Sequence, residues 1–319
     1  MFKKILSTNH LKWLGLFVSV ISIIWFGKEL LDHSSLFEKL SFTTAVTLIT
    51  CSLNYLIAFI FIGIAWQLLL LGSGEIGSTY ILAISITCLA QIGKYLPGNI
   101  GQHIGRVVLS KQHSFNLRVV LFTMFIETVW VIAIASLFSL LAIYYVGGRI
   151  FTGIPQIPQW WLLACLILIA LLSPIISHRV FNFISHWWAI NKGAKFHSMR
   201  MPSFTTFWLV GILYVLNFMV LGYILSTIGT QIFESPDNSI LLLSAIFAAA
   251  WITGFITPGA PAGIGVREVV LVAALTPIYG KEIAIGIAAV LRIVTVLGDG
   301  LAFLIGLVLS RYAEPVVVN

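Results

Sequence analysis

The chain has 319 residues, of which 59% are hydrophobic and only 9% are charged, and its mean hydropathy is +1.04. A soluble domain needs a charged, solvated surface, so this composition excludes one and indicates a polytopic membrane protein. The net charge of +7 does not indicate nucleic-acid binding, because the basic residues lie in loops beside apolar runs, where they set topology and meet anionic lipid head groups.

The first apolar run, residues 11–31, has three lysines before or at its start, Lys3, Lys4 and Lys12, and therefore resembles a signal peptide. No small-residue cleavage site follows it, and the run is long enough to span a bilayer, so we expect a retained span. Further apolar runs lie at 43–71, 79–110, 118–146, 160–177, 205–228, 239–279 and 283–310.

Two of these runs are interrupted by breaks rich in glycine and proline, at residues 94–106 and 257–268. In each break a Pro-Gly pair is followed, nine residues after the proline, by an arginine, which is Arg106 in the first break and Arg267 in the second. Interrupted hydrophobic segments at matching places in two halves of a chain are typical of the binding site of a transporter built from repeats.

A broken run can cross the membrane once as a kinked helix, or it can enter and return to the same side as a re-entrant hairpin. Lysine and arginine accumulate on the cytoplasmic side, so their distribution separates the alternatives. With the N-terminus inside and both broken runs re-entrant, the split between inside and outside is 10 to 4, whereas two single crossings give 5 to 9. The re-entrant topology is therefore favoured. It places inside Lys3, Lys4, Lys12, Lys111, Arg118, Arg179, Lys192, Lys195, Arg200 and Arg311, and outside Lys28, Lys39, Arg149 and Lys281.

This topology predicts an all-α polytopic membrane protein with six transmembrane helices and two opposed re-entrant helical hairpins. The order span, span, hairpin, span occurs twice, and the second copy starts on the opposite side of the membrane. We therefore expect an inverted repeat, with one half in residues 1–150 and the other in residues 151–319, and with both termini in the cytoplasm. Corresponding positions such as Pro97 and Pro258 are 161 residues apart, which supports the pairing.

The only sizeable polar loop, residues 178–202, mixes basic and aromatic side chains. Such a composition predicts a helix that lies in the cytoplasmic membrane interface. A docking surface for a partner enzyme is the alternative.

Ionisable groups inside apolar runs cost about 2.5–3.5 kcal/mol each on insertion scales, so the few that are present need a reason. Glu127 and Arg292 each lie nine residues into equivalent runs, which places them near the midplane and level with the hairpin tips. A tip of glycine and proline leaves backbone N–H groups free, the next helix points its positive end at the centre, and an arginine beyond it completes an anion site. The candidate substrate-binding residues are Lys94, Tyr95, Pro97, Gly98, Gly101, Arg106, Glu127, Pro261, Gly263, Gly265, Arg267, Glu268 and Arg292.

The same charges could instead pair with one another and only hold the hairpins in place. This alternative joins the arginines Arg106, Arg267 and Arg292 to the carboxylates Glu127, Glu268 and Asp299.

Three neighbouring groups also have two interpretations. Asp299 lies two helical turns after Arg292 and on the same face, so we expect it to pair structurally with that arginine. His103 could relay protons or touch a head group, but a lone histidine in a polar break is usually just hydrogen-bonded. Lys94 could bind phosphate or extend towards the membrane interface.

No known catalytic motif is visible in the sequence. The patterns G-x-x-x-x-G-K-[ST], G-x-S-x-G and H-E-x-x-H are all missing. The sequence therefore lacks the motifs that are typical of ATP hydrolysis, serine acyl transfer and zinc-protease chemistry. Cys51, Cys88 and Cys165 lie inside apolar segments without metal-like spacing. We therefore expect neither enzymatic activity nor a cofactor.

At its two breaks the sequence resembles the lysylphosphatidylglycerol synthase transmembrane-region family, also called flippase-like membrane proteins. The resemblance rests on Lys-Tyr-Leu-Pro-Gly at 94–98 with Gly101 and Arg106, and on Pro-Ala-Gly-Ile-Gly-Val-Arg-Glu at 261–268. The second motif is similar to the family's Pro-Gly-Gly-x-Gly-x-x-Glu, with Ala262 in place of one glycine. The resemblance extends over essentially the whole chain in length and span pattern.

The resemblance implies a protein that translocates a lipid with a charged head group between leaflets. Other members are associated with hopanoid transport or with glycosyltransferases that use polyprenyl-phosphate carriers. In the lysyl-lipid members a soluble synthetase domain follows the membrane part, whereas this sequence ends at Asn319, so we expect no aminoacyl transfer by this polypeptide alone.

We therefore expect a flippase-like translocase in the inner membrane of a bacterium, which moves a lipid or a polyprenyl-linked precursor with an anionic head group. Its expected partner is that membrane lipid or lipid-linked head group. Two alternatives stay open. One is an accessory subunit of a glycosyltransferase in cell-envelope glycolipid synthesis, which would use the loop 178–202, and the other is a transporter of a small soluble anion.

Overall fold

The computed structural model describes residues 42–96, 100–150, 200–236, 239–257 and 261–313, together with scattered positions in 20–32 and 175–186. All regular secondary structure among these residues is helical, as the sequence predicts. The described elements are α2 (Phe42–Gly72), α3 (Tyr80–Ala90), η3 (Gln91–Tyr95), α4 (Gly101–Gln112), α5 (Leu117–Ile150), α7 (Phe204–Phe233), α8 (Ile240–Ile256), η4 (Pro261–Gly263), α9 (Val266–Tyr279) and α10 (Lys281–Tyr312).

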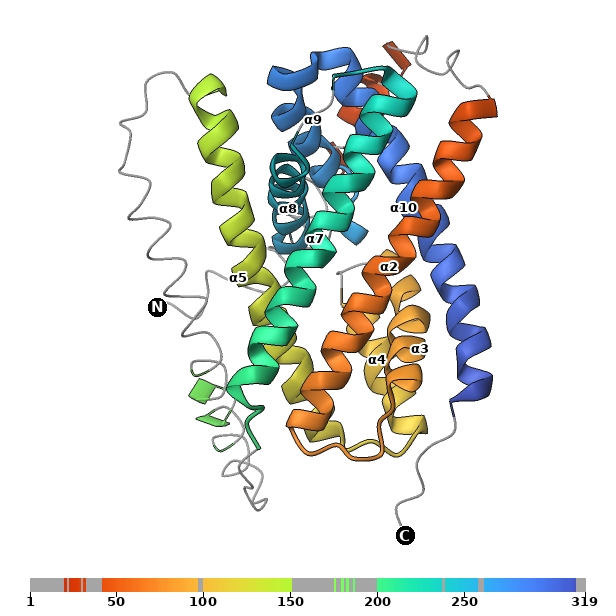
Figure 1. Ribbon diagram of the computed structural model, residues 1–319, viewed down its shortest axis with the longest axis vertical. Coiled ribbons are helices and arrows are strands. Elements are labelled where there is room, and N and C mark those ends of the chain that lie inside the picture. The colour runs from red at the N-terminus through yellow and green to blue at the C-terminus, as the bar shows by residue number, and fades with distance from the viewer. Residues whose placement is uncertain are drawn as a thin grey trace.

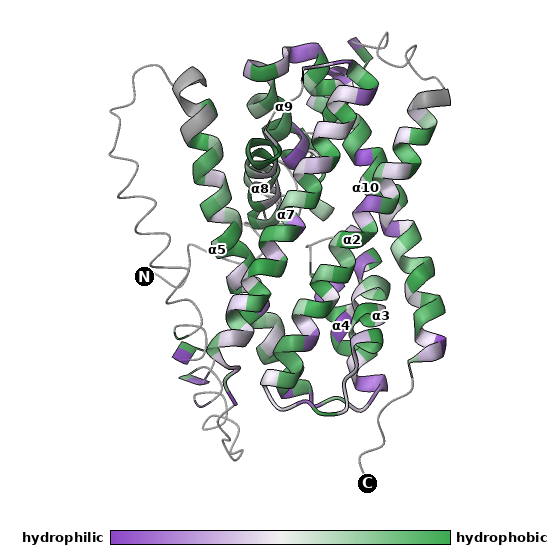
Figure 2. Cartoon of the chain, viewed as in Figure 1, coloured by the Kyte–Doolittle hydropathy of each residue, from purple (hydrophilic) through white to green (hydrophobic). Residues whose placement is uncertain are grey.

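Four of these helices are long and apolar enough to cross a membrane, so the chain is an integral membrane protein. They are α2, α5, α7 and α10, which have 30 to 34 residues and are coloured mostly as hydrophobic in Figure 2. At ~1.5 Å per residue each exceeds the ~30 Å hydrocarbon core. Their bounds agree within a few residues with the expected runs, and α7 extends five residues further, to Phe233.

Two expected spans lie largely outside the described residues. The run 11–31 is described only in part, and the run 160–177 only at residue 175. The number of spans is therefore still a prediction. The polar loop 178–202 likewise lies almost entirely outside the described residues.

Both Gly/Pro-rich breaks interrupt a helix, as predicted. In the first, α3 tightens into η3 and the chain starts a new helix, α4, at Gly101; in the second, α8 ends at Ile256 and α9 starts at Val266 after the short turn η4. The two arms contact each other in each case, so each broken run forms a helical hairpin. Figure 1 places α3 and α4 in the lower half of the molecule and α8 and α9 in the upper half.

The described helices follow the same order of lengths twice. A long helix, two short helices and another long helix occur as α2, α3, α4 and α5, and again as α7, α8, α9 and α10. In Figure 1 α2 runs downwards and α7 upwards, whereas α5 runs upwards and α10 downwards. The second series therefore runs in the opposite sense to the first.

The core lies between the two series, because helices of one pack on helices of the other. Helix α2 packs along α7, α5 packs on α8, and α10 packs on α3. Large side chains such as Phe218 and Phe247 are fully buried there, whereas Trp66 is fully buried in a second cluster formed mainly by helices of the first series. Small residues allow the backbones to approach closely, as at Gly222 on α7, which contacts Ser244 on α8.

Candidate functional site

The tips of the two hairpins meet in the middle of the molecule, where η3 contacts η4. This contact brings together the two breaks that the sequence identifies, although more than 150 residues separate them. The residues around the tips are therefore the candidate site, and their charged side chains form three separate networks.

Glycines hold the two arms of each hairpin close together. A Cβ added at Gly93 would lie 2.5 Å from the backbone of Gly101, and one added at Gly254 would lie 3.2 Å from the backbone of Gly263. The first distance leaves no room for any side chain, so the arms of the first hairpin touch backbone to backbone. Gly263 also adopts a φ of 68°, a left-handed conformation that glycine tolerates best.

The first network joins Arg106 on α4 to Glu127 on α5. The Arg106 Nη1 lies 2.6 Å from the Oε2 of Glu127, and the Tyr214 hydroxyl on α7 donates to Oε1 at 2.5 Å. The Arg106 guanidinium also lies over the Trp66 ring, 5.1 Å from its centroid. The Glu127 carboxylate neutralises the charge of Arg106 where both side chains are buried, and each of its oxygens accepts a hydrogen bond.

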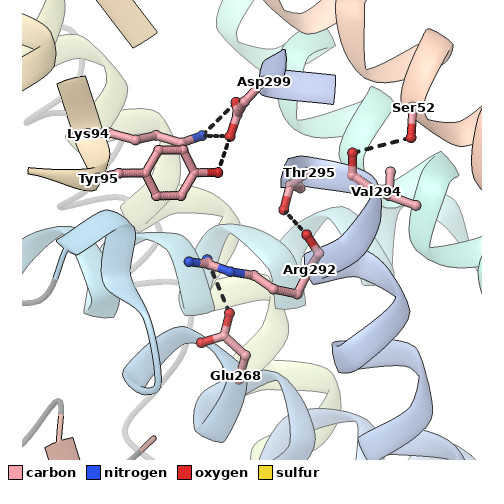
Figure 3. A network of polar contacts seen from close by, with 8 residues as sticks. All are labelled: Ser52, Lys94, Tyr95, Glu268, Arg292, Val294, Thr295 and Asp299. Carbon is pink, nitrogen blue, oxygen red and sulfur yellow. Dashed lines mark hydrogen bonds and ion pairs between the residues drawn. The ribbon is translucent and has the colours of Figure 1, made fainter. Parts of the chain in front are cut away.

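The second network joins Glu268, in the first turn of α9, to Arg292 on α10. The Arg292 Nη1 lies 3.3 Å from the Oε1 of Glu268, and the backbone N–H of Gly265 donates to Oε2 at 2.7 Å. Figure 3 shows Arg292 pointing towards this carboxylate. Glu268 therefore caps its own helix and stabilises the positive N-terminal end of α9 at the same time.

The third network connects the first hairpin to α10. Lys94 lies 2.7 Å from both carboxylate oxygens of Asp299, and the Tyr95 hydroxyl donates to Oδ2 at 2.5 Å. The two side chains reach Asp299 from the same side in Figure 3. The predicted pairing of Asp299 with Arg292 is thus wrong, because each bonds instead to a group on a hairpin.

Arg267, at the start of α9, stands apart from these networks. Its side chain is buried, with 8% of its surface exposed, and its Nε has no hydrogen-bond partner. The guanidinium lies over the Phe247 ring, 5.3 Å from the centroid. Among the described residues, none forms a hydrogen bond or ion pair with Arg267, so no carboxylate in this part of the chain is paired with it.

Two adjoining cavities lie between the hairpins. The first has a volume of about 110 Å³ and is lined by the cations Lys94, Arg267 and Arg292, while the second has about 130 Å³ and is lined by Arg106 and Glu127. They share a wall that contains three amides and two aromatic rings. These residues are Gln91, Gln102, Asn217, Trp251 and Phe255, which we call the shared wall; the aliphatic side chains of Ile62 and Leu221 also line both cavities.

The predicted site residues are distributed among these features. Lys94, Tyr95, Gly263, Arg267 and Arg292 line the first cavity. Arg106 and Glu127 line the second cavity, together with His103. The Nε2 of His103 lies 3.5 Å from the amide nitrogen of Gln102, in keeping with the hydrogen-bonding role expected for this histidine.

The other predicted residues support the site or lie outside the description. Glu268 bonds Arg292, and Gly265 caps α9 with a φ of 86°. Gly101 lets the arms of the first hairpin touch. Pro97 and Gly98 lie outside the described residues, as does the side chain of Pro261.

Sequence reasoning missed the shared wall and Tyr214. One signal was available for Asn217, because it is the only asparagine in the 30-residue apolar helix α7. Tyr214 and Trp251 gave no signal, since buried aromatic residues are common in apolar helices. Among the residues that the structure describes, no group of three histidine, cysteine, aspartate or glutamate side chains could hold a metal ion.

Comparison with known proteins identifies the family. Residues 12–302 match the family described as the lysylphosphatidylglycerol synthase TM region, so the chain belongs to that family, as its two breaks predicted. No curated protein matches the chain.

Proposed function

We propose that this member of the family is a translocase that moves a lipid or polyprenyl-linked precursor with an anionic head group between the leaflets of the bacterial inner membrane. The single observation that carries the proposal is the buried charge of Arg267, unpaired among the described residues, in a cavity between the hairpin tips. An unpaired charge in such an interior costs several kcal/mol, so a residue of this kind is retained for a ligand of opposite charge.

The lengths of the short helices support re-entrant hairpins. Helices α3, α4, α8 and α9 have 11 to 17 residues. At ~1.5 Å per residue they measure about 17 to 26 Å, less than the ~30 Å hydrocarbon core, so a single short helix does not cross it. With the opposite sense of the two helix series in Figure 1, these lengths support an inverted repeat with one hairpin entering from each side.

Apolar side chains around the hairpin tips support a lipid over a small soluble anion. Leu96, Ile100, Ile104 and Ile256, which lie in or beside the two breaks, are each more than half exposed. A lipid can keep its apolar tail against such side chains while its head group occupies the cavities. A soluble anion has no tail, and nothing in its transport calls for this arrangement.

The alternative of an accessory subunit for a glycosyltransferase depends on the loop 178–202. That loop lies almost entirely outside the described residues, and no observation favours this role. The translocase is therefore the function that the described geometry supports best.

The test uses the full-length protein reconstituted into vesicles that contain a trace of fluorescent phosphatidylglycerol or fluorescent polyprenyl phosphate. A membrane-impermeant reductant bleaches only the outer leaflet, so translocation converts the protected half of the signal into a bleachable one. We expect translocation with the wild type, none with Arg267→Gln, and wild-type rates with Arg311→Gln, which removes an exposed arginine at the end of α10. If neither lipid moves faster than in protein-free vesicles, the proposal is wrong.

A further inference from the structure

We infer that the head group taken by this site joins its phosphate to a neutral, hydroxyl-rich group such as a sugar or a glycerol, and that a head group carrying a cationic amine is rejected. The inference rests on the proposed translocase function and narrows its substrate class. It follows from the charges in the two cavities and from the chemistry of the shared wall.

The three described carboxylates around the cavities are each already bonded to groups of the protein. Both oxygens of Glu127, of Glu268 and of Asp299 already accept hydrogen bonds from the protein. An ammonium group on the ligand would have to share an oxygen that already accepts from a protein donor, or displace that donor. A buried cation left without its partner is strongly destabilising, so the site offers no cheap place for an amine.

The first cavity instead has one positive charge too many. Three cations line it, and among the described residues the carboxylates bonded to them are Asp299, on Lys94, and Glu268, on Arg292. Arg267 supplies the surplus, and its Nε still has a free N–H. A phosphate fits this site because the planar guanidinium can donate two parallel hydrogen bonds to its oxygens.

The shared wall beside this phosphate position is polar but uncharged. Asn217 donates its Nδ2 to the carbonyl of Ala58 at 3.1 Å, which leaves its Oδ1 to accept from a ligand hydroxyl. Gln91 and Gln102 add two more amides that can donate or accept. Amides of this kind suit hydroxyl groups, which are both donors and acceptors.

An aromatic surface completes the wall. Trp251 and Phe255 stack with centroids 5.0 Å apart and an angle of 12° between their planes, and Phe218 meets Trp251 edge-on at 5.9 Å. The stack is half-buried and lines both cavities. A flat aromatic face beside a few placed amides is suited to the C–H face of a sugar ring with its hydroxyls directed at the amides.

The experiment measures binding of five short-chain probes to the full-length protein in detergent, by titration calorimetry. The first pair compares citronellyl phosphoryl-mannose with citronellyl phosphate, and the second compares dihexanoyl phosphatidylglycerol with dihexanoyl phosphatidic acid, so the two pairs separate a prenyl carrier from a glycerophospholipid. The fifth probe is the lysyl ester of the phosphatidylglycerol. In at least one pair we expect the hydroxyl-bearing lipid to bind about tenfold more tightly than the lipid that ends in a phosphate. Without the hydroxyl groups of the ligand, the amides of the shared wall have no hydrogen-bond partner.

The lysyl ester should bind at least about tenfold more weakly than its parent, because its amine meets a positive cavity whose described carboxylates are already bonded to the protein. Equal or tighter binding of the lysyl ester overturns the inference. So does equal binding of the hydroxyl-bearing and bare lipids in both pairs.

A converting variant tests the same point by gain of function. Gln91→Glu places a carboxylate on the shared wall, so it should tighten binding of the lysyl ester and weaken that of its parent. The matched control is Gln112→Glu, which makes the same change at the exposed end of α4 and should alter neither affinity. A Gln91→Glu protein that binds both lipids like the wild type contradicts the inference.

Failure of the inference can be told apart from failure of the proposed function. Binding of a hydroxyl-bearing lipid with the expected ranking, but with no translocation in vesicles, overturns the translocase alone. Translocation of a fluorescent lysyl ester as fast as its parent lipid overturns the inference alone.

Discussion

Arg106 and Arg267 occupy the same position in the two breaks, but their surroundings differ. Arg106 meets a carboxylate on α5, whereas the corresponding position of α10 is occupied by another arginine, Arg292. Glu127 and Arg292 occupy equivalent positions in the two halves, so the charge at this position changes sign from one half to the other. It follows that one arginine is structural and the other is available to a ligand.

The ion pair of Arg106 can be tested through stability. Arg106→Gln should lower the free energy of unfolding by about 3–5 kcal/mol, because it leaves Glu127 buried without its partner. The double variant Arg106→Glu/Glu127→Arg should recover only part of the loss, since Tyr214 loses its acceptor. Titration with a denaturing detergent measures both. A loss below about 1 kcal/mol for the single variant would show that the pair does not matter for folding.

Arg267 should behave in the opposite way. Removing an unpaired buried charge relieves its desolvation, so Arg267→Gln should leave the thermal unfolding midpoint unchanged or raise it. Thermal unfolding of the purified protein without added lipid measures this, with Arg311→Gln as the control. A fall as large as that of Arg106→Gln would assign Arg267 a structural role.

At the scale of the elements, glycine decides how closely the arms of the first hairpin approach. Gly93 on η3 and Gly101 on α4 leave no space for a Cβ between them. The second hairpin has the same arrangement at Gly254 and Gly263, where the contact is less tight. The separation of the arms in turn sets where Lys94 and Arg106 lie, because both are within a few residues of the contact.

Gly93→Ala should therefore destabilise the protein by about 1–3 kcal/mol, since the obstructing atoms are backbone atoms of Gly101 that cannot turn aside. Gly211→Ala on α7 is the matched control, because no atom of the described residues lies within 4 Å of the added Cβ. It should stabilise by about 0.5–1 kcal/mol, as alanine does in an open helix position. Thermal unfolding measures the pair. If the unfolding midpoints of both variants shifted in the same direction, the contact between Gly93 and Gly101 would be unimportant for stability.

At the scale of the whole molecule, the bond of Lys94 to Asp299 joins a hairpin of the first helix series to the last helix of the second. The four long helices, α2, α5, α7 and α10, also pack mainly on helices of the other series. Movement of one hairpin would therefore act on the opposite half, which is what alternating access in the proposed translocase requires.

Much of this architecture could be predicted from the sequence, because long apolar runs and Gly/Pro breaks are local signals. The long helices and both breaks are at the expected places. The pairing of charges was not predictable in the same way. Asp299 shares a helix face with Arg292, but the tertiary contact with Lys94 decides its partner, and no local pattern records which helices pack together. The shared wall was hidden for the same reason.

The orientation of the whole molecule gives the last prediction. Lys111, Arg118, Arg200 and Arg311 lie at ends of helices that are at the bottom of Figure 1, whereas Lys281 lies at the top, between α9 and α10. Since basic residues accumulate on the cytoplasmic side, the lower end should face the cytoplasm.

In a cysteine-free background, a single cysteine at Gln112→Cys should react with a membrane-impermeant maleimide only in inside-out vesicles, and one at Glu282→Cys only in intact cells. Both positions are exposed, so accessibility does not limit the reaction. Labelling of both from one side is the outcome that opposed hairpins cannot produce, because α4 and α9 would then return to the same face and the inverted repeat would be lost. Labelling from opposite sides but in the reverse sense would keep the repeat and overturn only the orientation drawn from the charges.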